Sequence, residues 1–275
     1  MIIGVDLGGT NIRSGLVNDG EIISLNKSSL TEKDSFSSTI RQLINSIAPL
    51  VNEKVKGLGI GVPSLVDSKN GIVYEVANIP SWKEVALKKI LEDEFHIPVF
   101  VNNDVNCLVL GEHLYGEAKS CSSIVALAMG TGLGAGIIIN DTLYEGNNCG
   151  AGEVGSIPYL DSIFEDYTSS RFFEKHFGIT AAEANSEAIR GEQRAKLIWE
   201  DFGHHLGILI QTVMFAFDPQ LIMLGGSISK AYPYFEKSMR EIVAGFPYPE
   251  SVKRLNILQS KLENVAILGA AALVK

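Results

Sequence analysis

The hydrophobic pattern at the start of the chain predicts three short strands joined by tight turns. Residues 2–7, 11–17 and 21–28 are rich in apolar and β-branched side chains, and the turns between them are GGT and Asp19-Gly20. Asp-Gly between such runs is a strong signal for a β-hairpin. Five apolar residues then recur at helical spacing and predict an amphipathic helix: Phe36, Ile40, Leu43, Ile44 and Ile47.

Strands and helices alternate along the rest of the chain. "VKGLGIGVP" predicts a buried strand that ends at Gly61 and Pro63, residues 82–95 predict an amphipathic helix, and residues 97–101 predict another strand. From Ser122, "SSIVALAMGTGLGAGIIINDTLYEG" repeats the order strand, glycine turn, strand, turn, strand, and "PQLIMLGGSIS" adds a strand after several helices. Two such cycles, with little residue identity between them, predict two α/β domains that face each other across a cleft.

Composition limits the classes of protein to consider. The chain has 275 residues, of which 46% are hydrophobic and 20% charged, and this indicates an ordered globular protein of about two domains. The net charge of −9 and the lack of a Lys/Arg run argue against a nucleic-acid or anionic-membrane surface, so a small molecule is the expected partner. The longest apolar runs, such as residues 265–274, span about ten residues and are too short to cross a bilayer, so a cytoplasmic protein is expected.

The cysteines and histidines show no metal-binding or disulfide pattern. Cys107, Cys121 and Cys149 are odd in number and form no C-x-x-C pair, so we expect them to be buried residues without a disulfide framework or zinc knuckle. The histidines include no H-E-x-x-H arrangement, and each is expected to lie on the surface or to be packed: His96, His113, His176, His204 and His205.

Two glycine-rich turns join consecutive predicted strands, "DLGGTN" at residues 6–11 and "GTGLGAG" at residues 130–136. Glycine lets backbone N–H groups converge on an anion, and Thr10 and Thr131 add hydroxyl donors. Such loops suit phosphate, although either one alone is equally compatible with an ordinary hairpin. There is no G-K-[ST] in the sequence, so a Walker-type nucleotide site is not expected.

The second glycine turn also matches the dinucleotide-binding pattern, with Gly130, Gly132 and Ala135 at the required spacing. That motif requires a helix after the glycines, whereas Gly136 is followed by three isoleucines that favour a strand, so we reject it. A third turn, at residues 225–227, leaves room for a flat ring or a ribose against the backbone. The three turns together predict a nucleotide whose phosphates are held from both domains.

In its order of motifs the chain resembles the ROK family of sugar kinases and related repressors, essentially from end to end. The resemblance rests on "IIGVDLGGTNIRSGLV", "GLGIGVPSLVDSKNGIVYEVANIPSWK", "FVNNDVNCLVLGE", "ALAMGTGLGAGIII", "CGAGEVGSIPY", "IFEDYTSS", "LIMLGGSIS" and "NVAILGAAALV". It implies the actin-like, ribonuclease-H-like ATPase fold, with an interdomain cleft between an N-terminal domain (1–112 plus 264–275) and a C-terminal domain (113–263). The repressors carry a helix-turn-helix ahead of the first phosphate loop, and because Met1 stands at the first strand, the kinase branch is expected.

The stretch "VNNDVNCLVLGEH" places Asn102, Asn103 and Asp104 between a buried strand and a helix. Phosphoryl transfer to a sugar needs positioning, charge stabilisation and a group that accepts the hydroxyl proton. The resemblance implies that Asp104 is this base and that Asn103 hydrogen-bonds sugar hydroxyls. The alternative is that Asp104 only caps the helix.

The resemblance also implies the other site residues. Sugar contacts are expected from Asn78, Glu153 and Glu165, although Glu153 could be a solvated turn residue and Glu165 a first-turn helix acid. Asp6 is expected to hold Mg²⁺ through water, the alternative being a hairpin acid that bonds its own turn amides. ATP phosphates are expected at Gly8, Gly9, Thr10, Asn11, Gly130, Thr131, Gly132, Gly225 and Gly226.

The sequence departs from the family in one segment. Most ROK kinases have a histidine three residues after the "AGE" glutamate and zinc-binding cysteines beyond it, whereas this chain has Ser156 and then "SIPYLDSIF". Zinc is therefore not expected, and the loop that holds Glu165 must be fixed by packing, through Tyr159, Phe164 and Tyr167. The family histidine touches the sugar, so its loss puts glucose in doubt as the substrate.

The resulting hypothesis is an ATP-dependent hexose kinase that uses Mg²⁺, acts on the 6-hydroxyl of glucose or a related hexose, and forms a homodimer. The alternatives are a kinase for N-acetylmannosamine, N-acetylglucosamine or fructose, and a non-catalytic sugar sensor of the same fold. A nicotinamide-dependent enzyme would need a helix after Gly136.

Overall fold

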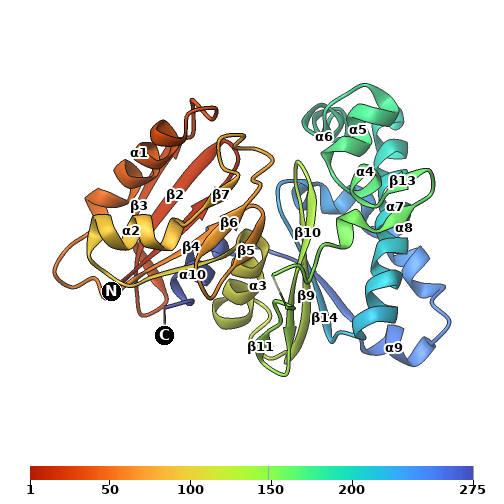
Figure 1. Ribbon diagram of the computed structural model, residues 1–275. Coiled ribbons are helices and arrows are strands. Elements are labelled where there is room, and N and C mark those ends of the chain that lie inside the picture. The colour runs from red at the N-terminus through yellow and green to blue at the C-terminus, as the bar shows by residue number, and fades with distance from the viewer. Residues whose placement is uncertain (148, 275) are drawn as a thin grey trace.

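The computed structural model describes residues 1–147 and 149–274, and in this part of the chain two five-stranded sheets lie on either side of helix α3 (Asp104–Tyr115) (Figure 1). The first sheet has the order β3-β2-β1-β4-β8 and the second the order β11-β10-β9-β14-β15. The first is made of β1 (Ile2–Leu7), β2 (Asn11–Asn18), β3 (Glu21–Ser29), β4 (Leu58–Val62) and β8 (Val99–Asn103). The second is made of β9 (Ser123–Met129), β10 (Leu133–Ile139), β11 (Thr142–Leu143), β14 (Leu221–Gly225) and β15 (Asn256–Gln259).

In both sheets an antiparallel meander is extended by two parallel strands, as the two hydrophobic cycles predict. β1 pairs antiparallel with β2 and parallel with β4, and β9 pairs in the same way with β10 and β14. The strand that follows Gly136 confirms that the glycines of the second turn are not a dinucleotide fingerprint. The mixed α/β architecture agrees with the predicted two-domain, actin-like fold.

Helices cover both faces of the first sheet because neighbouring residues of a strand point to opposite sides. Ser14 of β2 hydrogen-bonds Ser46 of α1 (Phe36–Ile47), whereas a Cβ on the next residue, Gly15, would meet Ile267 of α10 (Val265–Ala271). α1 and α10 therefore lie on opposite faces. α2 (Leu87–Phe95) packs against β8. Between β4 and α2 in the chain, β5 (Leu65–Asp67), β6 (Ile72–Tyr74) and β7 (Glu84–Val85) form a small sheet.

Two predicted boundaries in this half are wrong. The helix expected over residues 82–95 begins only at Leu87, because Trp82 is buried and donates its indole N–H to Thr39 of α1 at 2.8 Å, and β7 follows it. The strand expected over residues 97–101 runs from Val99 to Asn103, so Asn102 and Asn103 belong to the strand.

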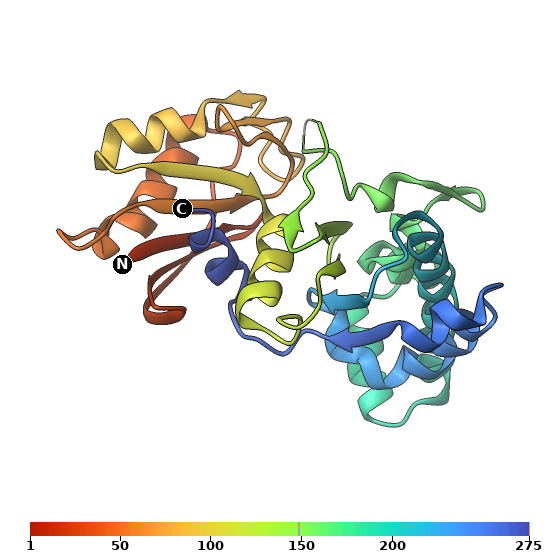
Figure 2. The same ribbon diagram turned by 90° about the horizontal axis from the view of Figure 1, so that it is seen from below.

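Helices cover one face of the second sheet (Figure 2), and aromatic side chains are prominent in the core of this half. Its largest buried side chains include Phe172, Phe173, Trp199, Phe202 and Phe235. The helices are α4 (Glu165–Thr168), α5 (Ser170–Phe177), α6 (Ala181–Ile189), α7 (Gln193–Phe217), α8 (Tyr232–Ala244) and α9 (Pro249–Arg254), with the 3-10 turns η2 (Val154–Ser156) and η3 (Ile228–Ala231) and the hairpin of β12 (Pro158–Tyr159) and β13 (Ser162–Ile163).

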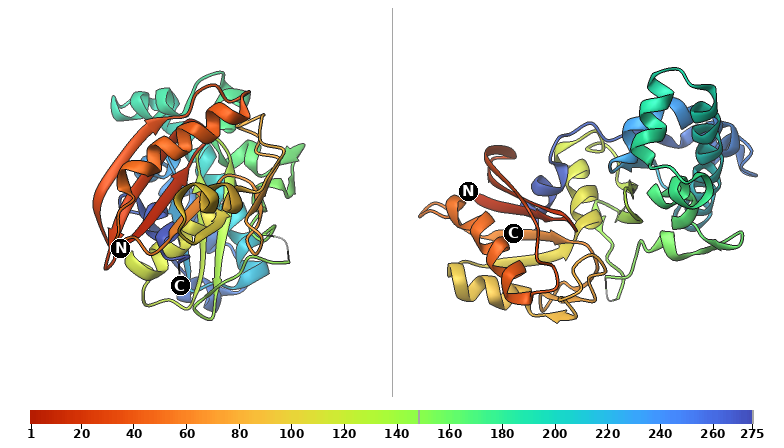
Figure 3. Two further views of the ribbon diagram at one scale, coloured as in Figure 1. Left: turned by 60° about the vertical axis from the view of Figure 1, so that its left-hand side comes forward. Right: turned by 90° about the horizontal axis from the view of Figure 1, so that it is seen from above.

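The two halves meet along α3, which packs on β9 and β10 of the second sheet and on α10, whose other side lies against the first sheet (Figure 3). Glycine permits these close approaches. A Cβ on Gly269 would lie 1.7 Å from the backbone oxygen of Cys107, and one on Gly136 would lie 2.5 Å from that of Val105. The predicted domain boundary at residues 112 and 113 falls within α3 and stays a prediction.

No helix among the described residues combines the length and the apolar character needed to cross a membrane.

Candidate active site

A cleft of about 430 Å³ lies where the two glycine turns and the start of α3 come together. Glu75, Pro63 and Ser64 also line it, and sequence reasoning missed all three as site residues. The sequence offers a usable signal for Ser64, because it follows the predicted strand end at Pro63. In the structure its φ is 155°, which residues with a side chain rarely adopt. Most of the predicted site residues line the cleft: Gly8, Gly9, Asn78, Asn103, Asp104, Gly130, Thr131, Gly132, Glu153, Glu165 and Gly226.

The remaining predicted residues lie beside the cleft. Asp6 lines an adjoining groove, which also contains Gly226. Thr10, Asn11 and Gly225 line neither cavity. Asn11 instead accepts a backbone hydrogen bond from Gly8 that closes the first turn, so its contribution here is to hold the turn.

The three polar residues at the start of α3 have separate roles. Asn103 is the N-cap, because its Oδ1 accepts hydrogen bonds from the backbone N–H groups of Val105 and Asn106, at 2.8 and 3.3 Å. Asn102 is buried and does not line the cleft, and its side chain donates to Glu145 and accepts from Asn106. Asp104 also accepts from the N–H of Val105, at 2.9 Å, but it lines the cleft and is not needed as the cap.

The cleft raises the pKa of Asp104 to about 7, from an ordinary value of 3.8. Removal of the carboxyl group from water is the largest cause, and the negative charges of Asp6 and Glu153 add to it. The bond from Val105 acts in the opposite direction but is weaker. A carboxyl group with a pKa near neutrality is well matched to taking up a proton during a reaction.

Glu165 joins the second glycine turn to the helical part of the second half. Its Oε2 accepts from the backbone N–H of Leu133 at 2.9 Å, and its Oε1 lies 2.8 Å from Arg171. A Cβ on Gly132 would come within 2.6 Å of the carboxylate, so a larger residue there would displace the Glu165 side chain. Glu153 faces the same cleft, and partial burial, with the charge of Glu165, raises its pKa.

The predicted packing behind Glu165 is confirmed. Tyr159 stacks on Phe164 with ring centroids 4.3 Å apart, and it meets Tyr167 edge-on at 5.2 Å. Its hydroxyl is 2.9 Å from Nδ1 of His205 on α7, a contact that the sequence did not predict. Ser156 is exposed on η2 and does not line the cleft.

Asp6 is buried at the end of β1 and is paired with Arg13 on β2, with 2.5 Å between Oδ2 and Nη2. Burial raises the pKa of Asp6, and the guanidinium group of Arg13 lowers it by less. Arg13, and not the amides of the turn, is therefore its partner. A single buried carboxylate beside the first glycine turn suits Mg²⁺, which prefers few carboxylates and keeps several waters.

Elsewhere in residues 1–147 and 149–274, no group of three or more His, Cys, Asp or Glu side chains is arranged to hold a metal ion. The expectation of no zinc site stays a prediction. Cys107 and Cys149 are buried as expected, and Cys121 is partly exposed.

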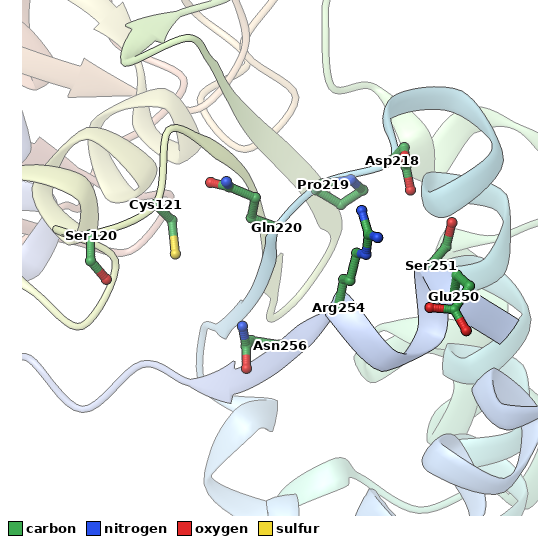
Figure 4. Close-up of a pocket in the computed structure, with 9 residues that line it drawn as sticks. All are labelled: Ser120, Cys121, Asp218, Pro219, Gln220, Glu250, Ser251, Arg254 and Asn256. Carbon is green, nitrogen blue, oxygen red and sulfur yellow. The ribbon is translucent and has the colours of Figure 1, made fainter.

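A larger groove, of about 710 Å³, lies at the opposite end of the second sheet (Figure 4). It is lined by the start of β14 and β15 and the loop before β9, with Asp218, Gln220 and Arg254 among its polar residues. None of the predicted site residues lines it, and no residue of the first sheet reaches it. The cleft beside Asp104 is therefore the candidate active site.

Comparison with known proteins agrees with this choice. A family model described as "ROK family" matches residues 2–275. A glucokinase of Thermotoga maritima is 30% identical over 100% of this chain and 97% of its own length, and a xylose repressor of Caldicellulosiruptor bescii is 28% identical over 99% of this chain and 77% of its own length. The crystal structure of a ROK family glucokinase from Streptomyces griseus with glucose and AMPPNP is 26% identical, with a TM-score of 0.85, and the match covers 99% of this chain and 98% of that one.

Proposed function

Because this chain belongs to the ROK family, we propose that it is an ATP-dependent sugar kinase that phosphorylates a hydroxyl of a hexose, with the 6-hydroxyl of glucose as the first candidate. The observation that carries the proposal is the position of Asp104. Its carboxyl group lines the cleft that both glycine turns share, and its pKa is about 7. Phosphate held by the turns would then lie beside a base that can take up the proton of an alcohol.

In this proposal Asp104, in its ionised form, accepts the hydroxyl proton as the new bond between oxygen and phosphorus forms. Asn103 supports it from the neighbouring position. Its side chain is held by the backbone oxygen of Ser64 at 3.1 Å and by two amides of α3, so its orientation is fixed before a sugar binds. Such preorganisation is how a protein positions a hydroxyl for transfer.

The donor would be held by backbone amides of residues 8–9 and 130–132, which come from opposite halves and line one cleft. Asp6 would hold Mg²⁺ through water, and the bound ion would neutralise charge on the donor phosphates. The turns offer only amides and hydroxyls to phosphate, so they would not distinguish one nucleotide from another, and that selectivity would come from other contacts.

Sugar selection is assigned to Asn78, Glu153 and Glu165, which approach the cleft from both halves. Carboxylates and amides bond hydroxyls in fixed directions, so a sugar of the wrong stereochemistry leaves buried polar groups without partners. Ser156, which stands where the family has a histidine, does not line the cleft, so the sugar contact expected of that histidine is not supplied from this position. An N-acetylated hexosamine or fructose is therefore the alternative substrate.

A panel of hexoses tests the proposal, with ADP release in the presence of MgATP as the readout. We expect ADP release with glucose or, failing that, with N-acetylmannosamine, N-acetylglucosamine or fructose, at kcat values of about 1–100 per second. The control is the Asp104→Ala variant under the same conditions. Equal ADP release by the two proteins, or release that does not depend on sugar, would contradict the proposal.

A second function has support because a xylose repressor is also among the relatives. The chain would then be a sugar sensor without turnover. In that case a sugar raises the melting temperature while no sugar in the panel releases ADP. Thermal melting with each sugar, with and without a non-hydrolysable ATP analogue, separates the two functions, because only the kinase needs both ligands to bind together.

A further inference from the structure

The connection between β11 and η2 reaches from the second half of the molecule to the first. We call it the bridging loop and define it as residues 144–147 and 149–152. Cys149 of this loop is buried within the hydrophobic core of the first half, in a cluster that also contains Val66 and Val73. In Figure 2 the loop runs beside the connections of the small sheet. A segment of the second half is therefore anchored in the first.

Glu145 makes polar contacts that add to this anchor. Its Oε1 accepts a hydrogen bond from Nδ2 of Asn102, which is buried near the end of β8. Its Oε2 accepts a hydrogen bond from the hydroxyl of Ser68, at 3.2 Å, in the turn between β5 and β6. Both donors belong to the first half. Hydrogen bonds to a charged acceptor are stronger than neutral ones, and two donors from separate segments fix both oxygens of the carboxylate.

Asn102 connects Glu145 to the segment that carries Asp104. The Oδ1 of Asn102 accepts from the backbone N–H of Asn103 at 2.8 Å and from the side chain of Asn106 at 3.0 Å. Asn103 is the N-cap of α3, and Asp104 follows it. The side chain of Asn102 therefore joins the bridging loop to the strand–helix junction of the proposed base.

The other end of the bridging loop leads to Glu153. The backbone oxygen of Gly152 accepts from the N–H of Ala135 at 2.8 Å, so the loop returns to β10. The N–H of Ala151 donates to the backbone oxygen of Glu145 at 3.3 Å, so the two ends of the loop are held together. Glu153 follows directly and lines the cleft. A shift of Glu145 would therefore be passed to Glu153 over a short, closed path.

We propose that Glu145 is a positioning residue. It holds Glu153, on the second half, at a fixed position relative to Asp104, on the first, and so sets the affinity of the cleft for sugar. This inference rests on the proposed function for the role of Glu153 as a sugar contact. The donor is assigned to the turns at residues 8–9 and 130–132, and none of the described hydrogen-bond partners of Glu145 lies in either turn. Loss of Glu145 should therefore weaken sugar binding and leave donor binding unchanged.

Glu145→Ala tests the proposal because it removes both acceptors. Calorimetric titration measures the affinity for glucose, or for the hexose of the panel that most raises the melting temperature, and separately the affinity for a non-hydrolysable ATP analogue with Mg²⁺. We expect about tenfold weaker sugar binding, the scale of one hydrogen bond to a charged group, and donor binding within about twofold of the wild type. Glu200→Ala, at an exposed position on α7, removes the same charge elsewhere and should change neither affinity.

Two results of these titrations would overturn the proposal. One is equal sugar affinity in Glu145→Ala and the wild type. The other is an equal loss of affinity for sugar and for the ATP analogue, because a contact that only stabilises the fold would weaken both. Unchanged binding of the analogue in the same preparation also shows that the variant is folded.

Exchanging the donor and the acceptor gives a second test. Asn102→Asp puts another carboxylate against Glu145, and the repulsion should weaken sugar binding by more than Glu145→Ala does. Adding Glu145→Gln to that chain supplies an amide that can donate to the new carboxylate, which still accepts from Asn103 and Asn106. The double variant should therefore bind sugar within about threefold of the wild type. Sugar binding as weak as in Asn102→Asp alone would mean that the contact between residues 102 and 145 does not set the affinity, and the proposal would fall.

The titrations separate this inference from the proposed function because they need no turnover. ADP release with sugar, together with sugar affinity that ignores Glu145→Ala, overturns the inference and leaves the kinase. Sugar affinity that depends on Glu145, without ADP release on any sugar, supports the inference and contradicts the kinase. A wild-type chain that binds none of the hexoses contradicts both.

Discussion

The two halves of the molecule share one strand order but differ in the chemistry at equivalent positions. In the first sheet the second-to-last residue of the central strand is Asp6, which lies opposite Gly61 of the next parallel strand. In the second sheet the equivalent residue is Ala128, which lies opposite Gly225. In both halves the residue near the end of the central strand therefore pairs with a glycine of the next strand, but only in the first half is that residue an acid.

The junctions between the last strand and the following helix differ in the same way. β8 runs directly into α3, so Asp104 follows the strand without a connection. β15 ends at Gln259, and α10 begins at Val265, after a connection with Asn264 in the left-handed conformation. The duplicated scaffold thus supplies amide-lined turns twice and a cleft carboxylate at a strand–helix junction once. A second set of acids would repel both Asp104 and the phosphates.

The largest effect is expected from a substitution at the strand–helix junction of the first half. Asp104→Ala removes the proposed base and should lower kcat/KM by about 10²-fold or more. Asn264→Gly at the equivalent junction keeps a residue that accepts the left-handed conformation, so its kcat/KM should stay within about threefold of the wild type. Steady-state measurements of kcat/KM on both variants test this expectation. Similar losses in both would mean that the junctions contribute structure alone.

The pH dependence sharpens the same comparison. In the proposed reaction the ionised form of Asp104 is the active one, and its pKa is raised to about 7, so activity should be full above that pH and lost below it. We expect kcat/KM to fall about tenfold for each pH unit below 7. Because Glu153 helps to raise this pKa, Glu153→Gln should move the midpoint to lower pH. A flat profile between pH 5 and pH 8 (about the range over which most proteins stay folded) would exclude Asp104 as the base.

These elements differ in how far the sequence could predict them. The two meanders follow from period-two patterns and turn residues, which are local, and the structure has them at the expected residues. The junction at Asp104 was predicted as well. The separate roles of the three polar residues at this junction were not, because Asn102 donates to Glu145, a partner 43 residues away in the chain. The groove beside Asp6 was not predicted at all. It is lined by Arg13, Lys27, Lys230 and Lys261, which lie far apart in the chain and meet only through the sheet order and the return of the chain in α10.

The wrong helix start has a similar cause. Trp82 fits the helical spacing of residues 82–95, but its indole N–H donates to Thr39, far away in the chain, and this contact holds Trp82 in an irregular segment before β7. Local periodicity cannot show such a partner. Contacts of this kind override propensity because a buried donor without an acceptor costs more free energy than a few helical residues gain.

Placing an acid in the second half tests whether the asymmetry of the strand ends matters. Ala128→Asp puts a carboxylate at the position equivalent to Asp6, beside the turn at residues 130–132. Repulsion of the donor phosphates should raise the KM for MgATP by about tenfold, the effect of roughly one unfavourable charge contact. Ala128→Asn introduces a side chain of the same size without the charge, so it is the control and should show little change. Unchanged KM in Ala128→Asp would mean that donor phosphates do not approach this turn.

The smallest expected effect concerns the aromatic support that only the second half has. Tyr159→Phe keeps the stack on Phe164 but deletes the hydroxyl that contacts His205. The loop before Glu165 should loosen slightly, so the KM for sugar should rise by about two- to fivefold with kcat nearly unchanged, as expected for the loss of one neutral hydrogen bond. His204→Ala, on the exposed side of the same helix, is the control. An equal rise in KM for sugar and for MgATP would show that the hydrogen bond supports the whole domain and not the sugar side of the cleft, because Glu165 also holds the turn through Leu133.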